Sequence, residues 1–263
     1  MIIDTHCHLD DDRYDSDLKD VIKRAKEAGV KGFLIPGADL KDLKKAQKIS
    51  NEFESVYFAA GVHPYHQKEY DKEVLKEFLK DPKCIAVGEC GLDYYRLPKD
   101  EDEKRIEKSE QLRVFEDQID LAIEYKKPLI IHIREASKDS YETLLNKAAN
   151  SVVGGVLHCY NASEILLDLA KYNFYFGIGG VITFKNEKKL GAILPQIPKD
   201  KLLIETDAPY LTPHPHRGER NEPLYTTLVV KKVATILNMS EDEVKNLTSN
   251  NAKTLFKAFE KLT

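Results

Sequence analysis

Two histidines separated by one residue, His6 and His8, follow a short apolar run near the start of the chain. In an extended strand, successive side chains point to opposite faces, so both imidazoles would face one side and Cys7 the other. Neutral imidazoles placed in this way are ligands for a borderline divalent cation. So short a motif also occurs as an ordinary structural pair, and the rest of the chain has to supply further ligands.

Other histidines take comparable positions, since six of the eight lie at or just past the end of a predicted strand. His132 lies within the run PLIIHI, His158 ends the run VVGGVLH, and His63 follows the run VYFAAGV. Any one of them could be a hydrogen-bonded histidine at the rim of a sheet. Their shared position at strand ends indicates a common site.

Two carboxylates occupy the same kind of position. Glu89 lies between an apolar strand and a glycine turn, and Asp207 lies just before Pro209, which ends its strand. A carboxylate buried at such a point is costly unless a cation or hydrogen bonds compensate its charge. A bound metal would supply that compensation for Glu89 and Asp207. Glu205, two residues earlier on the same face as Asp207, is a candidate to support the ligands.

Eight short apolar runs rich in valine, isoleucine and phenylalanine alternate with helical patterns, which predicts a parallel sheet. We expect strands at 2–6, 32–37, 56–62, 84–89, 128–133, 152–158, 173–179 and 202–207. The segment 16–29 is typical of the helices between them, with apolar residues at helical spacing and a glycine at its end. An open doubly wound sheet has the same pattern. However, ligands from strands this far apart in sequence can converge only if the sheet closes. We therefore predict a single (β/α)8 TIM barrel domain, residues 1–263, with the site at the carboxyl ends of its strands.

The composition restricts location and partners. The 263 residues carry a net charge of −4 with an isoelectric point near 6.1, so a nucleic acid would have to be held by a local basic patch or by metal ions. The four cysteines form no CxxC pair, and we find neither a secretion signal nor an apolar run of about 20 residues. We expect a cytoplasmic protein without membrane association. Cys7, Cys90 and Cys159, each beside a candidate ligand, are predicted to be packing residues.

Two further segments carry local signals. The charge run 99–111 predicts a solvated loop or an exposed helix. The segment 240–259 opens with a serine N-cap and has Glu243 three residues later, which predicts a helix packed around the barrel.

Taken together, these residues resemble the TatD-type deoxyribonucleases, a branch of the metal-dependent hydrolases related to the amidohydrolases. The matching motifs run in order along nearly the whole chain: DTHCHLD (4–10), GVHP (61–64), VGECGLDYY (87–95), PLIIHIREA (128–136), GVLHCY (155–160), FGIGG (176–180), LIETDAPYL (203–211), RGERNEP (217–223) and TSNNAKTLF (248–256). The charge run after Tyr95 is a few residues longer than the usual family connection. It leaves the metal motifs intact and affects the substrate entrance.

The resemblance implies two divalent cations, Mg²⁺, Mn²⁺ or Zn²⁺, at one site. The first would be surrounded by His6, His8, Glu89 and Asp207, and the second by Glu89, His132 and His158, so that Glu89 bridges. It also implies substrate contacts at the barrel mouth from five residues: His63, Arg134, Arg220, Asn221 and Glu222.

The activity that follows is hydrolysis of DNA phosphodiester bonds by a water that the cations activate, with Glu89 and Asp207 as the catalytic carboxylates and Asp207 as proton acceptor. A barrel mouth admits a single strand more readily than a duplex, so the expected substrate is a DNA end or single-stranded DNA. Three alternatives stay open: amidohydrolase-type cleavage of a small amide or ester, deacylation of D-aminoacyl-tRNA, and a catalytically silent metal-binding scaffold. Many amidohydrolases carry a lysine on the fourth strand where this chain has Glu89, which favours the phosphodiesterase.

Overall fold

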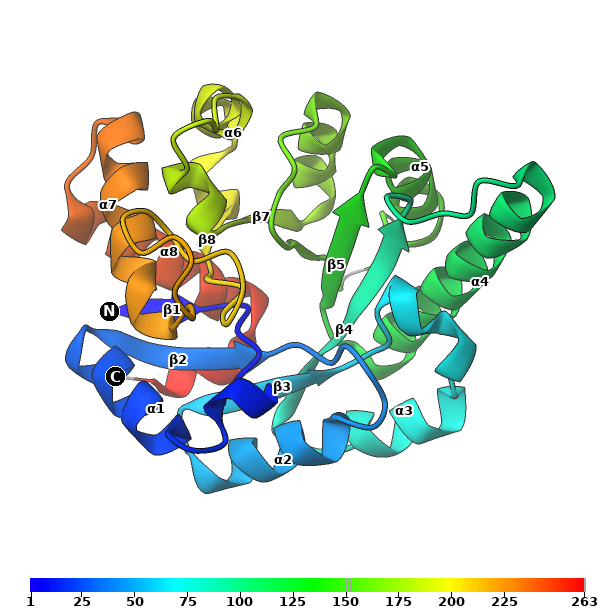
Figure 1. Cartoon of the computed structure of the whole chain (residues 1–263), viewed down its shortest axis with the longest axis horizontal. Helices are drawn as coiled ribbons and strands as arrows, with labels where there is room; N and C mark the ends of the chain where they lie inside the picture. The colour runs from blue at the N-terminus through cyan, green and yellow to red at the C-terminus, as the bar shows by residue number, and fades with distance from the viewer. Residues whose placement is uncertain (150, 152, 263) are drawn as a thin grey trace.

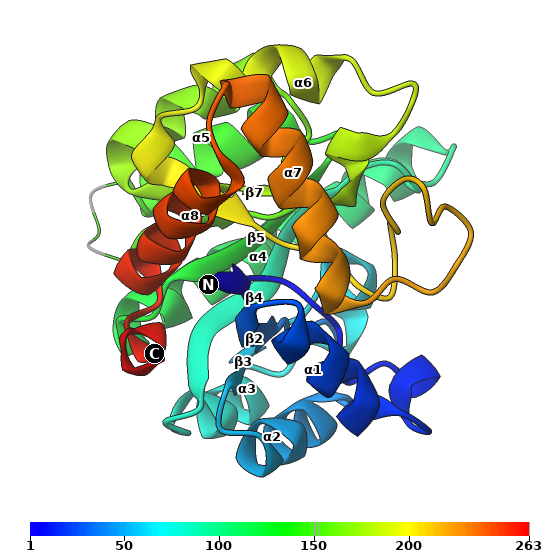
Figure 2. The ribbon, with the colours of Figure 1, turned by 90° about the vertical axis from the view of Figure 1, so that its left-hand side faces the viewer.

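The computed structural model describes residues 1–149, 151 and 153–262. Within these residues, eight parallel strands pair in sequence order to form one sheet. They are β1 (Ile2–Asp4), β2 (Val30–Ile35), β3 (Val56–Ala60), β4 (Cys84–Asp93), β5 (Leu129–Arg134), β6 (Gly155–Leu157), β7 (Phe174–Ile178) and β8 (Leu202–Ile204). Helices alternate with the strands and surround them (Figures 1 and 2). The arrangement is a nearly closed barrel, which confirms the predicted fold class.

The barrel closes between its first and last strands through residues 5–8, which follow β1, and residues 204–208, which begin at the last residue of β8. We call these two segments the closing seam. The amide of Thr5 donates to the carbonyl of Ile204 at 3.2 Å, and the amide of Asp207 donates to the carbonyl of His6 at 2.9 Å. Cys7 and Ala208 form a parallel bridge. The seam therefore lies at the carboxyl ends of the strands, where the candidate ligands were expected.

The outer layer contains eight α-helices among the described residues. They are α1 (Leu18–Glu27), α2 (Leu43–Glu52), α3 (Lys72–Leu79), α4 (Glu101–Tyr125), α5 (Ser137–Lys147), α6 (Lys189–Ile193), α7 (Thr226–Leu237) and α8 (Glu241–Leu255). Between β6 and β7 a 3₁₀ helix, Glu164–Tyr172, stands in the place of an α-helix. None of the described helices is long and apolar enough to cross a bilayer.

Three of these helices correspond to segments singled out in the sequence. α1 buries Val21, Ile22 and Ala25, as the helical spacing predicts. The charge run becomes the first turns of α4, where Asp100 caps the helix and the charged side chains face water. α8 begins with the expected capping box, in which Ser240 and Glu243 bond each other's backbone amides.

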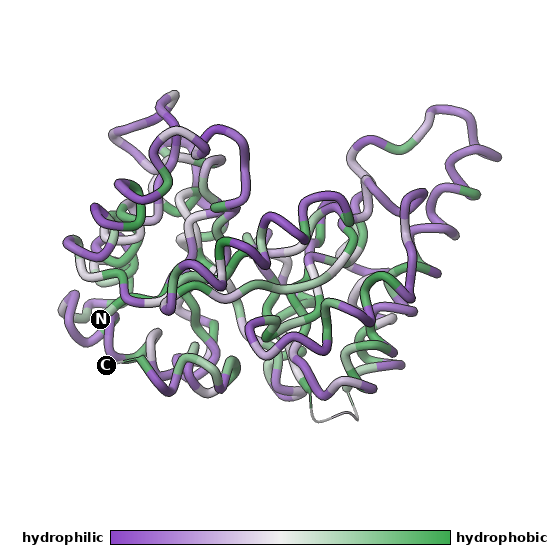
Figure 3. Tube along the Cα trace, turned by 90° about the horizontal axis from the view of Figure 1, so that it is seen from below, coloured by the Kyte–Doolittle hydropathy of each residue, from purple (hydrophilic) through white to green (hydrophobic). Residues whose placement is uncertain are grey.

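Two apolar layers hold the barrel together. The inner layer consists of strand residues that point to the barrel axis, among them Ile3, Leu34, Ile130, Val156 and Leu203, and the aromatic rings of Phe256 and Phe259 pack against it. The outer layer lies between strands and helices. In Figure 3 hydrophilic segments gather at the periphery of the molecule. The C-terminal segment thus contributes side chains to the barrel interior, and the opposite end is left for the site.

Strand ends differ from the predicted ranges where the site begins. β1 stops at Asp4 and β8 at Ile204, short of the predicted 6 and 207, because the following residues leave the ladder to form the closing seam. β4 instead continues past Glu89 to Asp93 and pairs with β5 from Val87 to Asp93, with a register shift between Val87 and Cys90. Val152, the predicted start of the sixth strand, lies outside the described residues.

Candidate metal centre

Several polar side chains meet at one point because alternate residues along the barrel strands face the barrel axis. His132, His158 and Glu205 each stand two residues after an inward-facing apolar residue of β5, β6 or β8. At the equivalent point of β7 the residue is Gly177, and a Cβ there would lie 2.2 Å from Oε2 of Glu205. The missing side chain on β7 therefore leaves room for the carboxylate that arrives from β8.

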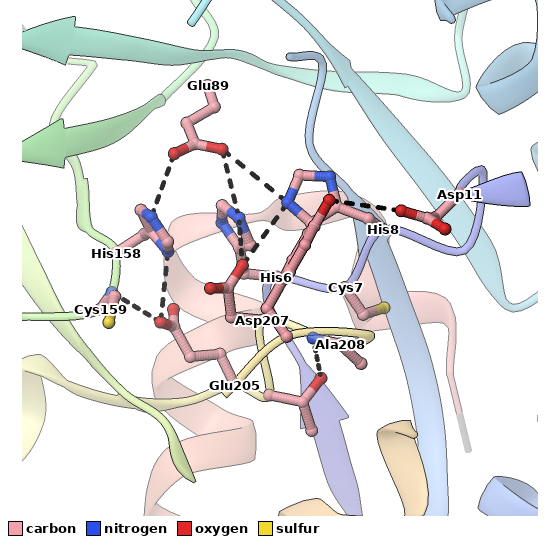
Figure 4. A network of polar contacts seen from close by, with 12 residues as sticks. His6, Cys7, His8, Asp11, Glu89, His158, Cys159, Glu205, Asp207 and Ala208 are labelled. Carbon is pink, nitrogen blue, oxygen red and sulfur yellow. Dashed lines mark hydrogen bonds and ion pairs between the residues drawn. The ribbon is translucent and has the colours of Figure 1, made fainter. Parts of the chain in front are cut away.

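Glu89 lies at the centre of the polar cluster and is 3% exposed. Its Oε2 faces the first-strand histidines, at 3.4 Å from Nε2 of His6 and 4.0 Å from Nε2 of His8. Its Oε1 faces three others, at 2.9 Å from Nδ1 of His132, 3.0 Å from Nε2 of His158 and 3.7 Å from Nε2 of His63. The two oxygens of one carboxylate thus face two different groups of imidazoles. Figure 4 shows Glu89 with His158 on one side and with His6 and His8 on the other.

Asp207 completes the side of the cluster formed by the closing seam. Its Oδ1 lies 3.6 Å from Nε2 of His6 and 3.5 Å from Nε2 of His8. The residue has a positive φ of 57°, and its backbone is held by neighbours on both sides. The carboxylate of Asp4 accepts from the amide and hydroxyl of Thr206, and the side-chain amide of Asn221 donates to the carbonyl of Thr206. These bonds fix the turn that aims Asp207 at the histidines.

Charge balance within the cluster explains the pKa directions. Burial alone would raise the pKa of Glu89, but His158, His6 and His132 outweigh it and hold that pKa well below its ordinary range. Burial lowers the pKa of His63 to about 3, so its imidazole is neutral at physiological pH. Glu89 is thus ionised, and its charge is available to a cation.

The donor set fits divalent cations. Both ring nitrogens of His6 are buried without a hydrogen-bond partner, and Nε2 points between two carboxylate oxygens at distances too long for hydrogen bonds. Two groups of side chains offer ligand atoms within 4.8 Å of one another and share Glu89: His6 with His8 and Glu89, and Glu89 with His132 and His158. Imidazole nitrogens and carboxylate oxygens are the ligands that zinc and manganese take. A cation in the first group would give the unpaired Nε2 of His6 a partner.

Two further carboxylates stand behind the histidines. Oδ2 of Asp93 lies 2.9 Å from Nε2 of His132, and Oε1 of Glu205 lies 3.4 Å from Nδ1 of His158. Each leaves the other ring nitrogen facing Glu89, which is the way protein carboxylates orient metal-binding imidazoles. Glu205 was expected in a supporting position, whereas Asp93 was not singled out from the sequence. Its signal was available, since it lies four residues after Glu89 in the same alternating run.

The expected substrate contacts separate into two sets. His63 lies in the cluster beside His132, with ring centroids 4.3 Å apart, and Arg134 is exposed at the end of β5. Arg220 instead donates to both carboxylate oxygens of Asp17 at 2.8 and 2.7 Å and to Glu222 at 2.9 Å. Its guanidinium is thus already occupied by carboxylates.

The side chain of Asn221 is likewise engaged by the protein's own backbone. It is buried and bonds the backbone around Asp207, while Glu222 accepts from Arg24 as well as Arg220. The structure therefore does not bring Arg220, Asn221 and Glu222 to the metal cluster. These bonds favour a supporting role for the loop over the substrate contact expected from the sequence.

A pocket of about 450 Å³ opens beside the cluster. His132, His158 and Asp207 form one wall, and its other lining is mainly apolar, including Ile133, Tyr160, Val181, Leu190 and Leu211. Cys159 also lines it and is partly exposed, unlike the buried Cys7 and Cys90, so the packing role predicted for it holds less well. The pocket gives a substrate access to the candidate ligands.

Closed parallel barrels with histidines and carboxylates at the carboxyl face define a class of metal-dependent hydrolases. The chain belongs to the TatD related DNase family, whose model matches residues 3–257. This confirms the resemblance seen in the motifs.

Individual relatives are similar over almost their whole length. The chain is 41% identical over 263 residues to YabD, an uncharacterized metal-dependent hydrolase of Bacillus subtilis, covering 98% of this chain and 99% of the relative. It is 34% identical over 265 residues to the 3'-5' ssDNA/RNA exonuclease TatD of Shigella flexneri, covering 97% and 98%. Among solved structures, YJJV, a TatD homolog from Escherichia coli, superposes with a TM-score of 0.88 at 26% identity, covering 97% and 98%.

Proposed function

We propose that the protein is an exonuclease that removes nucleotides from the ends of single-stranded DNA. The observation that carries this proposal is the position of Glu89, because each of its two carboxylate oxygens faces a different group of imidazoles. That geometry suits a carboxylate shared by two cations, the arrangement used by many phosphodiesterases. The name of the Shigella relative supports a 3' to 5' direction and leaves RNA as a second substrate.

The proposed ligands are those of the two groups that share Glu89. His6, His8, Glu89 and Asp207 would hold one cation, and Glu89, His132 and His158 the other. Such a pair, when bound, lowers the pKa of water toward neutrality and offsets the negative charge of a phosphodiester. Mg²⁺, Mn²⁺ and Zn²⁺ are the candidate ions.

The other residues of the site accept a proton, orient the ligands or contact the substrate. Asp207 lines both the cluster and the pocket, so its carboxylate is placed to take the proton of the attacking water. Asp93 holds the ring of His132 through a hydrogen bond, and Glu205 faces Nδ1 of His158 at 3.4 Å, so each ring keeps one nitrogen toward Glu89. Arg134, on the pocket wall, offers a guanidinium to a phosphate. A cytoplasmic location stays a prediction, and the oligomeric state is left open.

The test is digestion of a single-stranded oligonucleotide labelled at its 5' end, with Mg²⁺, Mn²⁺ or Zn²⁺ added separately. We expect a ladder that shortens from the 3' end, slower digestion of a blunt duplex, and no ladder with Glu89→Gln. RNA of the same sequence and a D-aminoacyl-tRNA are included as competing substrates. Release of free D-amino acid without any DNA ladder under all three ions would refute the nuclease and favour the deacylase.

A further inference from the structure

The arginines of the chain divide sharply by partner. Five of the eight pair with carboxylates, namely Arg13, Arg24, Arg105, Arg113 and Arg220. Arg217 stacks on Phe184 and donates to the carbonyl of Thr212. Within the described residues, Arg96 and Arg134 have neither an ion-pair partner nor a side-chain hydrogen bond. Two exposed positive charges are therefore available to an anionic partner.

Each of these two arginines lies over an exposed tyrosine. The guanidinium carbon of Arg134 is 3.6 Å from the ring centroid of Tyr95, and that of Arg96 is 5.1 Å from the ring centroid of Tyr65. Tyr95 is 53% exposed and Tyr65 is 38% exposed. An exposed aromatic ring beside an unpaired guanidinium offers a nucleotide both a stacking face and a phosphate contact.

Both pairs adjoin the metal cluster. The amide of Tyr65 donates to Nδ1 of His63 at 3.1 Å, and the two rings are 4.9 Å apart. The amide of Tyr95 donates to the carboxylate of Asp93 at 2.9 Å, which also holds His132. A strand whose terminal phosphodiester reached the cluster would therefore have its next nucleotides near these rings.

We propose that Tyr65, Tyr95, Arg96 and Arg134 form a stacking platform that holds the unpaired bases of a single strand beside the metal centre. This inference rests on the proposed function and adds to it the surface that selects single strands. Unpaired bases can each turn a face to a tyrosine, whereas in a duplex only the outer face of the terminal base pair is not covered by a neighbouring pair. Stacking is tolerant of sequence, so the platform selects for strandedness and for the presence of bases.

The test is equilibrium binding of a fluorescent single-stranded oligonucleotide in EDTA, where stacking needs no metal and cleavage is prevented. The same backbone carrying abasic sites near its 3' end provides the second ligand. For the intact strand, Tyr95→Ala should raise the Kd about five- to tenfold, the lower part of the range measured for a stacked base. For the abasic strand the same substitution should change the Kd less than about twofold, because no base is left to stack.

Two variants on the outer surface serve as matched controls. Ile165→Ala removes another exposed apolar side chain, and Arg105→Ala removes another exposed arginine. Both should bind as the unchanged protein does. Arg96→Ala should flatten the dependence of log Kd on log salt by about 0.7, the value for one phosphate contact to a single strand.

Equal binding of intact and abasic strands, the absence of binding to either, or an equal loss with both strands in Tyr95→Ala would overturn the platform. Digestion with added metal is scored separately. Failure of the metal-loaded protein to cut DNA while base-dependent binding persists refutes the nuclease and leaves the platform standing. Normal digestion together with binding that does not depend on the bases supports the nuclease and refutes the platform.

Discussion

Replacing Gly177 by alanine places a methyl group against the carboxylate of Glu205. The added Cβ would lie 2.2 Å from Oε2 and 2.8 Å from Cδ, more than about 1 Å inside van der Waals contact. Glu205 is fully buried, and its Oε1 accepts the amide of Cys159 at 2.6 Å. It therefore has to move, and the movement weakens that charge-assisted bond.

The expected cost follows from these contacts. Overpacking in a filled core costs about 1 to 3 kcal/mol, and loss of a hydrogen bond to a buried charged group costs a similar amount. We expect Gly177→Ala to lower the free energy of unfolding by about 2 to 3 kcal/mol. Because Glu205 orients His158, metal affinity should also fall, by about tenfold.

Gly179→Ala is the matched control. Its Cβ would meet the same side chain, but no closer than 3.5 Å, and its φ of −110° suits any residue. Its stability should stay within about 0.5 kcal/mol of the parent or rise slightly. Urea unfolding gives the stabilities, and isothermal titration with Zn²⁺ gives the affinities. If Gly177→Ala matches the control in both measurements, Glu205 does not fill this space. If stability falls while metal affinity holds, Glu205 packs there without orienting His158.

Four other changes probe the rest of the site. Glu89→Gln should lose at least one metal per chain, measured by elemental analysis, and nearly all hydrolysis; full activity with two metals would show that Glu89 does not bridge. Asp207→Asn should abolish turnover yet keep most single-strand affinity, because no positive charge is removed, and a matching loss of binding would contradict this. Arg220→Ala should lower unfolding stability by about 1 kcal/mol and leave DNA affinity unchanged, since its guanidinium is bound to Asp17 and Glu222. Arg220 and Arg24 hold the pKa of Asp17 below its ordinary value, so the contribution of Asp17 is full above about pH 4 and is lost as pH falls further. The stability gap between the parent and Asp17→Asn should then close in acid, as urea titrations from pH 7 to 3 would reveal.

The barrel and the convergence of its histidines were predictable because both depend on local periodicity. Alternation along a strand determines which side chains face inward. His132 and His158 could therefore be assigned to the interior, because each lies two positions after an apolar residue in the sequence. The family motifs supplied the pairing of these residues with Glu89. The closing seam was not predictable in the same way, because β1 and β8 end early through backbone bonds between residues about 200 positions apart.

Arg220 shows most clearly what could not be predicted from the sequence. In the sequence it belongs to the motif RGERNEP, and the family resemblance implied a substrate contact for it. Its carboxylate partner Asp17 lies 203 positions away, and no local pattern reports such a pairing. Tyr95 and Arg134 were also separate features in the sequence, and their stacking depends on the pairing of β4 with β5.

Because of the closing seam, the candidate site can assemble only when the barrel is complete. His6 follows the first strand and Asp207 follows the last, and the amide of Asp207 donates to the carbonyl of His6. A growing or partly folded chain can form β2 to β7 and still lack the meeting of these two residues. His6, His8 and Asp207, half of the proposed ligands, are therefore brought together only when the final strand is in place. A fragment that ends before residue 207 lacks Asp207 and cannot hold the first cation as the complete chain would.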